Sequence, residues 1–556
     1  MASNGVATNG VSAESHSPAA THTKSQRYLS TRGEDSDLSF EEVVLKGLAN
    51  DGGLYIPEAI PEAPQWQTWK DLPFNELAYN VLSLYISPSE IPADDLKDII
   101  NRSYSTFRAP EITPLVHLQD DIHLLELFHG PTFAFKDVAL QFLGNLFEYF
   151  LTRRNVGKTG RDRYHLTVVG ATSGDTGSAA IYGLRGKKDV SVFMLHPKGK
   201  VSPIQELQMT TVLDANVHNL AITGNFDNCQ DIVKALFADP DINSTLKLGA
   251  VNSINWARIL AQTVYYFHSY FALARQSETF KVGDKVRYVV PSGNFGDVLA
   301  GYFAFRMGLP VDKLVIATNE NDILDRFWKT GKYEKKATHG PEAEGGIESD
   351  GVKAHEDGVK ETLSPAMDIL VSSNFERLLW FLAYQFAESA GMDDEWNKKQ
   401  AGQEVSGWLK ELKTKGGFGP VYKDVLETAR RNFDSERVSD QETLDTIKSI
   451  YNEVGYVLDP HTAVGVEAAR RSVKQVGSGV IPHISLSTAH PAKFAGAVTL
   501  ALNDAPGFEF NEKVLPKEFV GLDQKEKRVR DVENDWKAVR ELVKKEVEEE
   551  LAAAQY

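Results

Sequence analysis

The feature that most constrains the fold is a regular alternation of short apolar runs and helical patterns, which begins near Glu111. Apolar runs of about four to eight residues, bounded by Gly, Pro or Asn, are typical of strands that are buried on both faces. Since helical patterns separate these runs, a parallel α/β sheet is the natural packing. We predict strands at 163–169, 190–195, 217–222, 287–290, 314–318 and 481–486, and helices at 176–184, 201–212, 227–237 and 297–306.

The chain is too long for one ordinary domain, because its 556 residues, 42% of them hydrophobic, can fill several packed layers. Residues 1–27 are poor in large apolar side chains, which predicts a disordered tail. Short helices and turns over 28–110 indicate a small N-terminal accessory domain, and the pattern over 111–515 indicates two α/β subdomains. Within this region, the charged and Gly-rich stretch at 331–360 predicts an exposed loop.

The last part of the chain, 516–556, contains a strongly charged helix that we place at 529–551. Its apolar residues recur at every third or fourth position, which gives the helix one apolar stripe. We expect this stripe to dock on the helix's own domain rather than on a partner. The stripe consists of Val532, Trp536, Val539, Val543 and Val547.

Charge and cysteine content exclude several classes of protein. The net charge of −17 argues against a nucleic-acid binder, which would present a basic face. No apolar run reaches the roughly 20 residues of a membrane helix. The single cysteine, Cys229, cannot form an internal disulfide, which fits a reducing compartment, and we expect it to be a core residue. Because the N-terminus lacks the features of a secretory or mitochondrial signal, a cytoplasmic location is predicted.

Three turns rich in Gly, Ser or Thr occupy 171–177, 291–297 and 485–491, each after a predicted strand or before a predicted helix. In an open parallel sheet, such turns lie at the carboxyl ends of the strands, where ligands bind. Their backbone N–H groups, together with the positive end of a following helix, suit an anion. One turn of this composition is usually only a turn, and none matches a Walker A or dinucleotide motif. Together, the three predict two anion sites, one for a cofactor phosphate and one for a substrate.

A single lysine, Lys136, stands among Phe133, Phe135 and other apolar residues in the segment 126–137. Desolvation favours the neutral form of such an amine, which is the form that Schiff-base chemistry requires. A surface lysine at the start of a helix is the ordinary alternative, but it does not account for the three turns. We therefore predict that Lys136 carries pyridoxal phosphate (PLP) as a Schiff base.

These segments resemble the threonine synthase family, in its fungal and enteric-bacterial branch. The resemblance implies a PLP-dependent enzyme of fold type II, which is like the β subunit of tryptophan synthase, with parallel sheets flanked by helices and the PLP-binding catalytic region at 111–515. It also implies O-phospho-L-homoserine as substrate, converted with water to threonine and phosphate by γ-elimination and β-hydration. The resembling segments are 129–137, 170–178, 199–204, 252–258, 293–297, 364–377, 459–463 and 488–494.

The resemblance implies roles for individual residues. Lys136 matches the PLP lysine, which also serves as the base, and Thr488 matches a hydroxyl residue beside the pyridine nitrogen. Asp175, beside the cofactor's 3′-oxygen, replaces an asparagine of many fold type II relatives. The cofactor phosphate would be held by Gly293, Asn294, Phe295, Gly296 and Asp297, with the backbone N–H rather than the carboxylate of Asp297 facing it, and the substrate carboxylate by Thr172, Ser173 and Thr176.

Arg258 is predicted to bind the substrate phosphate. Asn255, Arg258 and Gln262 are spaced so that they fall on one helical face, and Arg258 is the only cation between 251 and 262. A planar guanidinium can hold a phosphate through two parallel hydrogen bonds. A structural salt bridge is the competing interpretation of Arg258, and Lys198 or Lys200 is a further candidate for contact with the phosphate.

Two other functions stay open at this point. A related phospho-lyase would release phosphate and form 2-oxobutyrate without adding water to Cβ, and a catalytically inactive relative would only bind a ligand. The intact Lys136 and turn residues argue against the inactive relative. We predict no metal site and no nucleic-acid or membrane partner, and we expect a monomer or a weak homo-oligomer.

Overall fold

The computed structural model describes residues 25–335 and 358–553. Its larger sheet has six strands in the order β13-β10-β9-β14-β4-β3, and it is parallel except for the antiparallel pair of β3 and β4. Every residue of β9 and of β14 is buried, as expected for parallel strands that are covered on both faces. The strands are β3 (Leu115–Gln119), β4 (Ile122–Glu126), β9 (Val286–Pro291), β10 (Val311–Thr318), β13 (Phe433–Arg437) and β14 (His483–Ser487).

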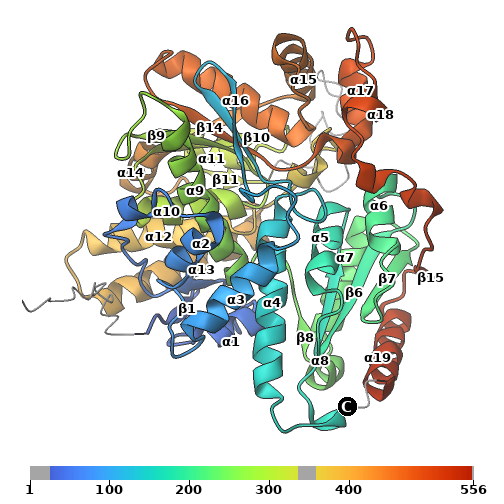
Figure 1. Ribbon diagram of the computed structural model, residues 1–556. Helices are drawn as coiled ribbons and strands as arrows, with labels where there is room; N and C mark the ends of the chain where they lie inside the picture. The colour runs from blue at the N-terminus through green and yellow to red at the C-terminus, as the bar shows by residue number, and fades with distance from the viewer. Residues whose placement is uncertain (1–24, 336–357, 554–556) are drawn as a thin grey trace, which may run out of the picture.

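A smaller sheet is parallel throughout and has five strands in the order β15-β7-β6-β5-β8. Together with the helices around it, this sheet forms the lobe to the right of α4 in Figure 1. Its strands are β5 (Leu166–Ala171), β6 (Val190–Pro197), β7 (Val217–Ile222), β8 (Leu248–Gly249) and β15 (Arg530–Val532), and its helices are α5 (Asp175–Leu184), α6 (Pro203–Thr210), α7 (Phe226–Ala238), α8 (Pro240–Leu246) and α19 (Trp536–Ala553).

Two long buried helices, α4 (Lys136–Arg154) and α9 (Trp256–Gln276), pack on each other. On its other side α4 packs on α5 of the smaller-sheet lobe, and this contact depends on small residues. A side chain at Gly144 in α4 would overlap the backbone carbonyl of Gly183 in α5. The helix α4 therefore meets α5 at backbone distance, and its first residue, Lys136, lies where the two lobes face each other.

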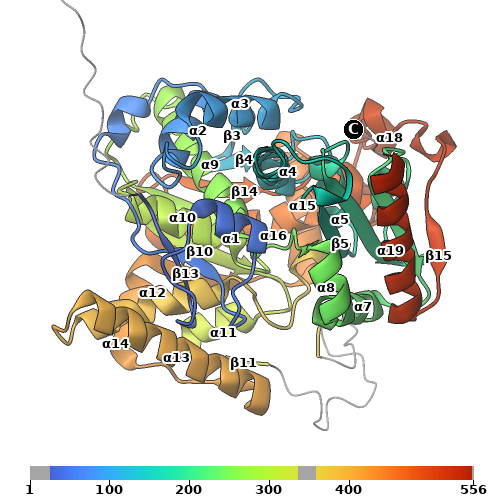
Figure 2. The ribbon, with the colours of Figure 1, turned by 90° about the horizontal axis from the view of Figure 1, so that it is seen from below.

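The N-terminal segment packs on these two helices (Figure 1), because α1 contacts α4 and α9, α2 contacts α9, and α3 contacts α4. Figure 2 shows α13 and α14 at one edge of the molecule and α19 at the opposite edge. The elements not yet given are β1 (Tyr28–Ser30), α1 (Phe40–Lys46), β2 (Tyr55–Pro57), α2 (Phe74–Leu82), α3 (Ala93–Tyr104), α10 (Gly296–Arg306), α11 (Ile323–Thr330), β11 (Tyr333–Glu334), α12 (Phe375–Glu388), α13 (Asp394–Lys415), β12 (Gly417–Phe418), α14 (Lys423–Asn432), α15 (Asp440–Val454), α16 (Pro460–Val476), α17 (Ala495–Leu502) and α18 (Phe510–Lys513), with short 3-10 helices at Trp66–Trp69, Gly160–Asp162, Pro365–Met367, Pro491–Phe494, Lys517–Phe519 and Leu522–Gln524.

The predicted strands and helices of the α/β region are confirmed, with shifts at their ends. The strand predicted at 217–222 has the same bounds in β7, and the helix predicted at 297–306 is α10, which begins at Gly296. The strand β5 begins at Leu166 rather than at residue 163, and Arg163 instead forms an ion pair with Asp189. Cys229 is buried near the start of α7, as expected.

The prediction of a helix over 529–551 is wrong at its start. The helix α19 begins at Trp536, because Arg530–Val532 pair with β7 as the edge strand β15. Its apolar stripe does dock on its own lobe, since Val539, Val543 and Val547 are fully buried in a cluster with residues of α7.

The prediction of an exposed loop over 331–360 is wrong for the described ends of that loop. Tyr333 pairs with Phe418 between β11 and β12 and is buried, and Lys360 is buried as well. Residues 336–357 of the same loop, and residues 1–24 of the predicted tail, lie outside the described residues.

Candidate active site

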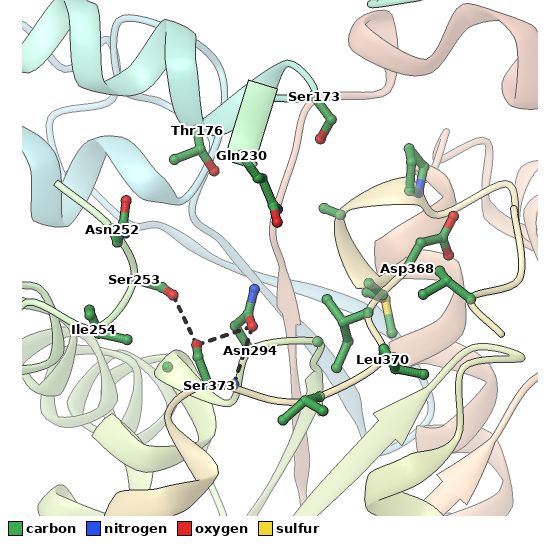
Figure 3. A pocket seen from close by; sticks show the side chains of 18 of the residues that line it. Ser173, Thr176, Gln230, Asn252, Ser253, Ile254, Asn294, Asp368, Leu370 and Ser373 are labelled. Atoms are coloured by element: carbon green, nitrogen blue, oxygen red, sulfur yellow. Dashed lines mark hydrogen bonds between the residues drawn. The ribbon is translucent and has the colours of Figure 1, made fainter. Parts of the chain in front are cut away.

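A cavity of about 1660 Å³ lies where the carboxyl ends of β5, β9 and β14 face the start of α4. All three of the turns that were predicted to bind anions reach it, through Thr172, Gly293 and Thr488. Parallel strands direct their carboxyl ends to the same edge of a sheet, which explains why segments far apart in the sequence meet here. Figure 3 shows Ser173 and Thr176 on one side of this cavity and Asn294 and Ser373 on the other.

Lys136 is half-buried, and it lines the cavity as the first residue of α4. Burial lowers the pKa of its amine to about 8. The charges nearby act in both directions, since Asp175 and Asp297 raise this pKa, and Arg258 and Lys493 lower it. The site therefore gives the amine a much larger neutral fraction near pH 8 than an exposed lysine has.

The loop before Lys136 is held by the next residue, Asp137. The buried carboxylate of Asp137 accepts hydrogen bonds from the backbone N–H of Thr132 at 2.7 Å and from the Thr132 hydroxyl at 2.8 Å. Burial raises the pKa of Asp137 to about 6, and the bonds from Thr132 oppose this rise. These contacts fix the turn from which α4, and with it Lys136, begins.

The turn between β5 and α5 presents its hydroxyl groups in two ways. The Thr172 oxygen accepts hydrogen bonds from the N–H groups of Gly174 at 2.9 Å and Gly177 at 2.8 Å, so this side chain mainly shapes the turn. Ser173 is exposed and Thr176 is half-buried, and both line the cavity. The hydroxyl groups of Ser173 and Thr176 are therefore the groups of this turn that are available to an anionic ligand at the start of α5.

The carboxylate of Asp175, at the start of α5, contacts two other side chains. Its Oδ1 forms an ion pair with Nζ of Lys493 at 2.8 Å and accepts a hydrogen bond from Nε2 of Gln205 at 2.7 Å. Burial pushes the pKa of this carboxyl upward, but the cations Lys493 and Lys136 outweigh burial and hold the pKa below its usual range. Asp175 is therefore an ionised, paired carboxylate where many fold type II relatives have an asparagine.

The turn between β9 and α10 approaches the segment at 366–367 closely. A side-chain carbon at Gly293 would lie 3.0 Å from the carbonyl oxygen of Ala366 and 3.0 Å from Cα of Met367. Asn294 lines the cavity, and its Oδ1 accepts a hydrogen bond from the Ser373 hydroxyl at 3.1 Å (Figure 3). Gly293 thus lets the backbone of this turn pack closely against the segment at 366–367.

Three further residues of the same turn differ in how they face the cavity. Phe295 adopts a left-handed conformation with φ of 62°, and its fully buried ring packs against Phe375 instead of lining the cavity. Gly296 and Asp297 line the cavity at the start of α10. Burial raises the pKa of Asp297 to about 6, and its carboxylate accepts a hydrogen bond from the N–H of Val298.

Thr488 directly follows β14 and lines the cavity with little exposed surface. Its carbonyl oxygen accepts a hydrogen bond from the N–H of Phe135 at 2.8 Å. Because Phe135 immediately precedes Lys136, this bond connects the Thr488 turn to the segment that carries the predicted PLP lysine.

Arg258, in the first turn of α9, is 3% exposed and lines the cavity. Its Nη1 donates to the carbonyl oxygen of Val251 at 2.9 Å, and its buried Nε has no hydrogen-bond partner. Burial lowers the pKa of Arg258 to about 10, with no carboxylate opposing that shift. Among the described residues Arg258 forms no salt bridge, which argues against the competing structural interpretation.

The other residues considered for the phosphate lie elsewhere. Asn255 caps α9 and donates to the carbonyl of Val44, so it does not share the cavity with Arg258. Gln262 does line the cavity, and its buried Oε1 has no partner. Lys198 is exposed and paired with Asp531 at 2.5 Å, and Lys200 is exposed; neither lines the cavity.

Some residues of the cavity were not assigned a role from the sequence. His461 lines the cavity: its Nδ1 lies 2.9 Å from Oδ1 of Asp459, and its Nε2 accepts the N–H of Ala366 at 3.1 Å. Lys493 does not line the cavity itself but pairs with Asp175, which does. Both lie in segments that carry the family resemblance, at 459–463 and 488–494. That position in the sequence was the signal available for them, but it does not reveal their partners.

The residues present fit PLP. An amine of lowered pKa suits a covalent bond to the cofactor's aldehyde, and the start of α10 with its glycine-containing turn suits the phosphate group. Buried polar atoms of the cavity are left without partners in the protein, namely Arg258 Nε, Gln262 Oε1 and Ser292 Oγ close by. Unpaired buried groups of this kind are rare in folded proteins, and a polar ligand would satisfy them.

Three family models match the chain. A model described as threonine synthase N terminus matches residues 27–104, one described as pyridoxal-phosphate dependent enzyme matches 107–369, and one described as threonine synthase, C-terminal matches 462–543. A threonine synthase from Schizosaccharomyces pombe is 59% identical over 497 residues, which are 89% of this chain and 93% of the relative. The chain belongs to the threonine synthase family.

Solved structures agree with this membership. The crystal structure of threonine synthase from yeast matches with a TM-score of 0.85 and 54% identity, covering 95% of this chain and 99% of that one. The structure of PLP-bound threonine synthase from Brucella melitensis matches with a TM-score of 0.80 and 40% identity, covering 94% and 99%. The predicted family, the α/β fold of the PLP-dependent enzymes and the cofactor are thereby confirmed. None of the described helices is long and apolar enough to cross a membrane.

Proposed function

We propose that this enzyme converts O-phospho-L-homoserine and water to L-threonine and phosphate. The observation that carries the proposal is that Arg258, a buried arginine with no carboxylate partner among the described residues, shares one cavity with Lys136. The first residue supplies a site for a phosphate, and the second supplies a reactive amine. The names of the relatives point to the same reaction.

Different residues of this chain bind the cofactor and transfer protons in the proposed reaction. PLP, when bound, supplies the electron sink that stabilises negative charge on the substrate's Cα. Lys136 holds the cofactor between turnovers, and its neutral amine removes the Cα proton and returns one later. The N–H groups at the start of α10, with Gly293, Asn294 and Asp297, bind the cofactor phosphate. The hydroxyl of Thr488 would accompany the pyridine nitrogen, and a neutral group there would leave that nitrogen largely unprotonated.

Substrate binding uses both lobes. The turn with Thr172, Ser173 and Thr176 receives the carboxylate at the start of α5, where the helix dipole favours an anion. Arg258 on α9 receives the phosphate. Holding both ends of the substrate would place Cα beside Lys136 and leave Cβ and Cγ between the lobes. There a Cβ proton leaves, phosphate departs from Cγ and water adds at Cβ, while protons return to Cγ and Cα.

The phospho-lyase alternative uses the same early steps and differs only in the fate of Cβ. If water does not add there, the product decays to 2-oxobutyrate. Incubation of the purified protein, loaded with PLP, with O-phospho-L-homoserine distinguishes the two reactions. We expect threonine and phosphate in equal amounts; 2-oxobutyrate as the main product would replace the proposal with the lyase, and no phosphate release would refute both.

The proposal includes a cytoplasmic location and a monomeric or weakly associating state. The location is supported by the single buried cysteine, which needs no oxidising compartment. Sedimentation of the full-length enzyme across a range of concentrations tests the state of association.

A further inference from the structure

The side chain of Lys493 is fully buried and joins three parts of the molecule. It lies in the 3-10 helix Pro491–Phe494, just after β14 of the larger sheet. Its Nζ forms the 2.8 Å ion pair with Asp175 at the start of α5, which belongs to the other lobe. The same Nζ donates to the carbonyl oxygen of Thr132 at 2.8 Å, in the loop that precedes Lys136. Lys493 therefore connects the two lobes and bonds to the loop that leads into Lys136.

Asp175 has two cations near it, and only one of them is paired with it. A buried carboxylate persists in its ionised form only when it is paired and hydrogen-bonded. Lys493 provides the ion pair, and Nε2 of Gln205 provides a further bond to the same oxygen. Lys136 is the second cation that acts on Asp175, and it is left outside this pair.

We propose that Lys493 is a positioning residue which occupies Asp175 and thereby leaves a larger fraction of the Lys136 amine uncharged and free for the cofactor. The inference deepens the proposed function, because it rests on the use of Lys136 as the PLP lysine. Without Lys493, Asp175 would remain as a buried carboxylate whose next cation is Lys136. The two would pair, and the amine would become charged and unreactive.

The other charges that face this site do not replace Lys493. Arg258 lowers the pKa of Lys136, as Lys493 does, but its guanidinium is bonded to the carbonyl of Val251. His461 acts on Asp175 from α16, but its Nε2 accepts the N–H of Ala366 and its Nδ1 faces Asp459. Asp297 raises the pKa of Lys136, so it acts in the same direction as the loss of Lys493. The buried carboxylate of Asp137 already accepts a hydrogen bond from the N–H of Thr132.

The test measures the reactivity of Lys136 itself. The full-length chain, freed of PLP, is acetylated competitively with acetic anhydride across a range of pH, and the peptide that contains Lys136 is quantified by mass spectrometry. In Lys493→Met we expect the apparent pKa of Lys136 to rise by about one to three units, since an opposite charge at close range shifts a pKa by that much. Acetylation at pH 8 should then be at least about tenfold slower.

Three further variants separate charge from structure. The double variant Asp175→Asn with Lys493→Met removes both partners and should return the Lys136 pKa to its original value or below. Lys493→Arg keeps a cation and should leave that pKa unchanged. Lys198→Met removes an exposed lysine outside the cavity and should also leave it unchanged.

Thermal melting of the same samples reports on stability. If Lys493→Met lowers the melting temperature and leaves the Lys136 pKa unchanged, Lys493 is only structural and the proposal is overturned. If Lys493→Met does not fold, the variant Asp175→Asn tests the proposal instead. It removes the carboxylate and should lower the Lys136 pKa. An unchanged or raised pKa overturns the proposal. The labelling needs no substrate, so a failure here is distinct from a failure to form threonine.

Discussion

The most informative single substitution is Arg258→Ala. Among the described residues, Arg258 donates one hydrogen bond, to the carbonyl of Val251, and its buried Nε has no partner. Few contacts within the protein therefore depend on its guanidinium. A hydrogen bond to a charged partner contributes about 1.5–3 kcal/mol. If the substrate phosphate is that partner, kcat/KM for O-phospho-L-homoserine should fall roughly 10- to 150-fold, at about 1.4 kcal/mol per factor of ten.

Stability should respond far less than kcat/KM. The substitution leaves the Val251 carbonyl without its bond, which costs roughly 1–3 kcal/mol, but it also removes a buried charge that has no counter-ion, and this gain offsets the cost. Arg258→Lys should recover part of the activity, because a point charge lacks the bidentate geometry.

The assay for Arg258 is steady-state phosphate release, with thermal melting and PLP content measured on the same preparation. Arg275→Ala is the matched control, since Arg275 is the other arginine of α9 and is exposed, with a hydrogen bond to the carbonyl of Lys70. A normal kcat/KM in Arg258→Ala, or a defect that consists mainly of unfolding, would show that the phosphate is held elsewhere.

Three further predictions concern the cofactor. Lys136→Ala should abolish turnover and covalently bound PLP while the melting temperature stays close to that of the unaltered enzyme; more than trace threonine would remove Lys136 from its role. Thr488→Asp should impair kcat more than Thr488→Ser, because a carboxylate would favour protonation of the pyridine nitrogen, and equal activities would place Thr488 outside the site. The rate at which the PLP-free enzyme binds PLP covalently should rise with pH up to about 8 and then level off, because the neutral amine reacts and burial lowers the Lys136 pKa to about 8; a rate that keeps rising toward the ordinary lysine pKa would contradict this.

The sequence predicted the buried strands well because their burial is visible in composition. The runs that became β6 and β7 are apolar for most of their length, and the turns after parallel strands are where ligands bind. The strands β3, β4 and β8 were not predicted, and neither were the charged edge strands β13 and β15. Their sequences, Phe433–Arg437 and Arg530–Val532, carry no apolar run, and only the neighbouring strand makes them part of a sheet.

The candidate site was predictable to the level of which segments meet, and less so for individual side chains. Phe295 was expected beside the cofactor phosphate, but its left-handed backbone turns the ring into an aromatic cluster. The pairing of Asp175 with Lys493 joins residues from two lobes, and no local pattern reveals such a contact. Tertiary packing therefore decides which polar residues of a resembling segment face the ligand.

Oxygen tracing tests the central claim most directly. The PLP-loaded enzyme is incubated with O-phospho-L-homoserine in water enriched in oxygen-18, and the amino acid and the phosphate are analysed by mass spectrometry. γ-Elimination followed by hydration at Cβ predicts threonine with one oxygen-18 in its hydroxyl group and released phosphate without label, because the bond from carbon to oxygen breaks. Labelled phosphate together with homoserine would show simple hydrolysis at phosphorus, and 2-oxobutyrate in place of threonine would show elimination without hydration; either result contradicts the account.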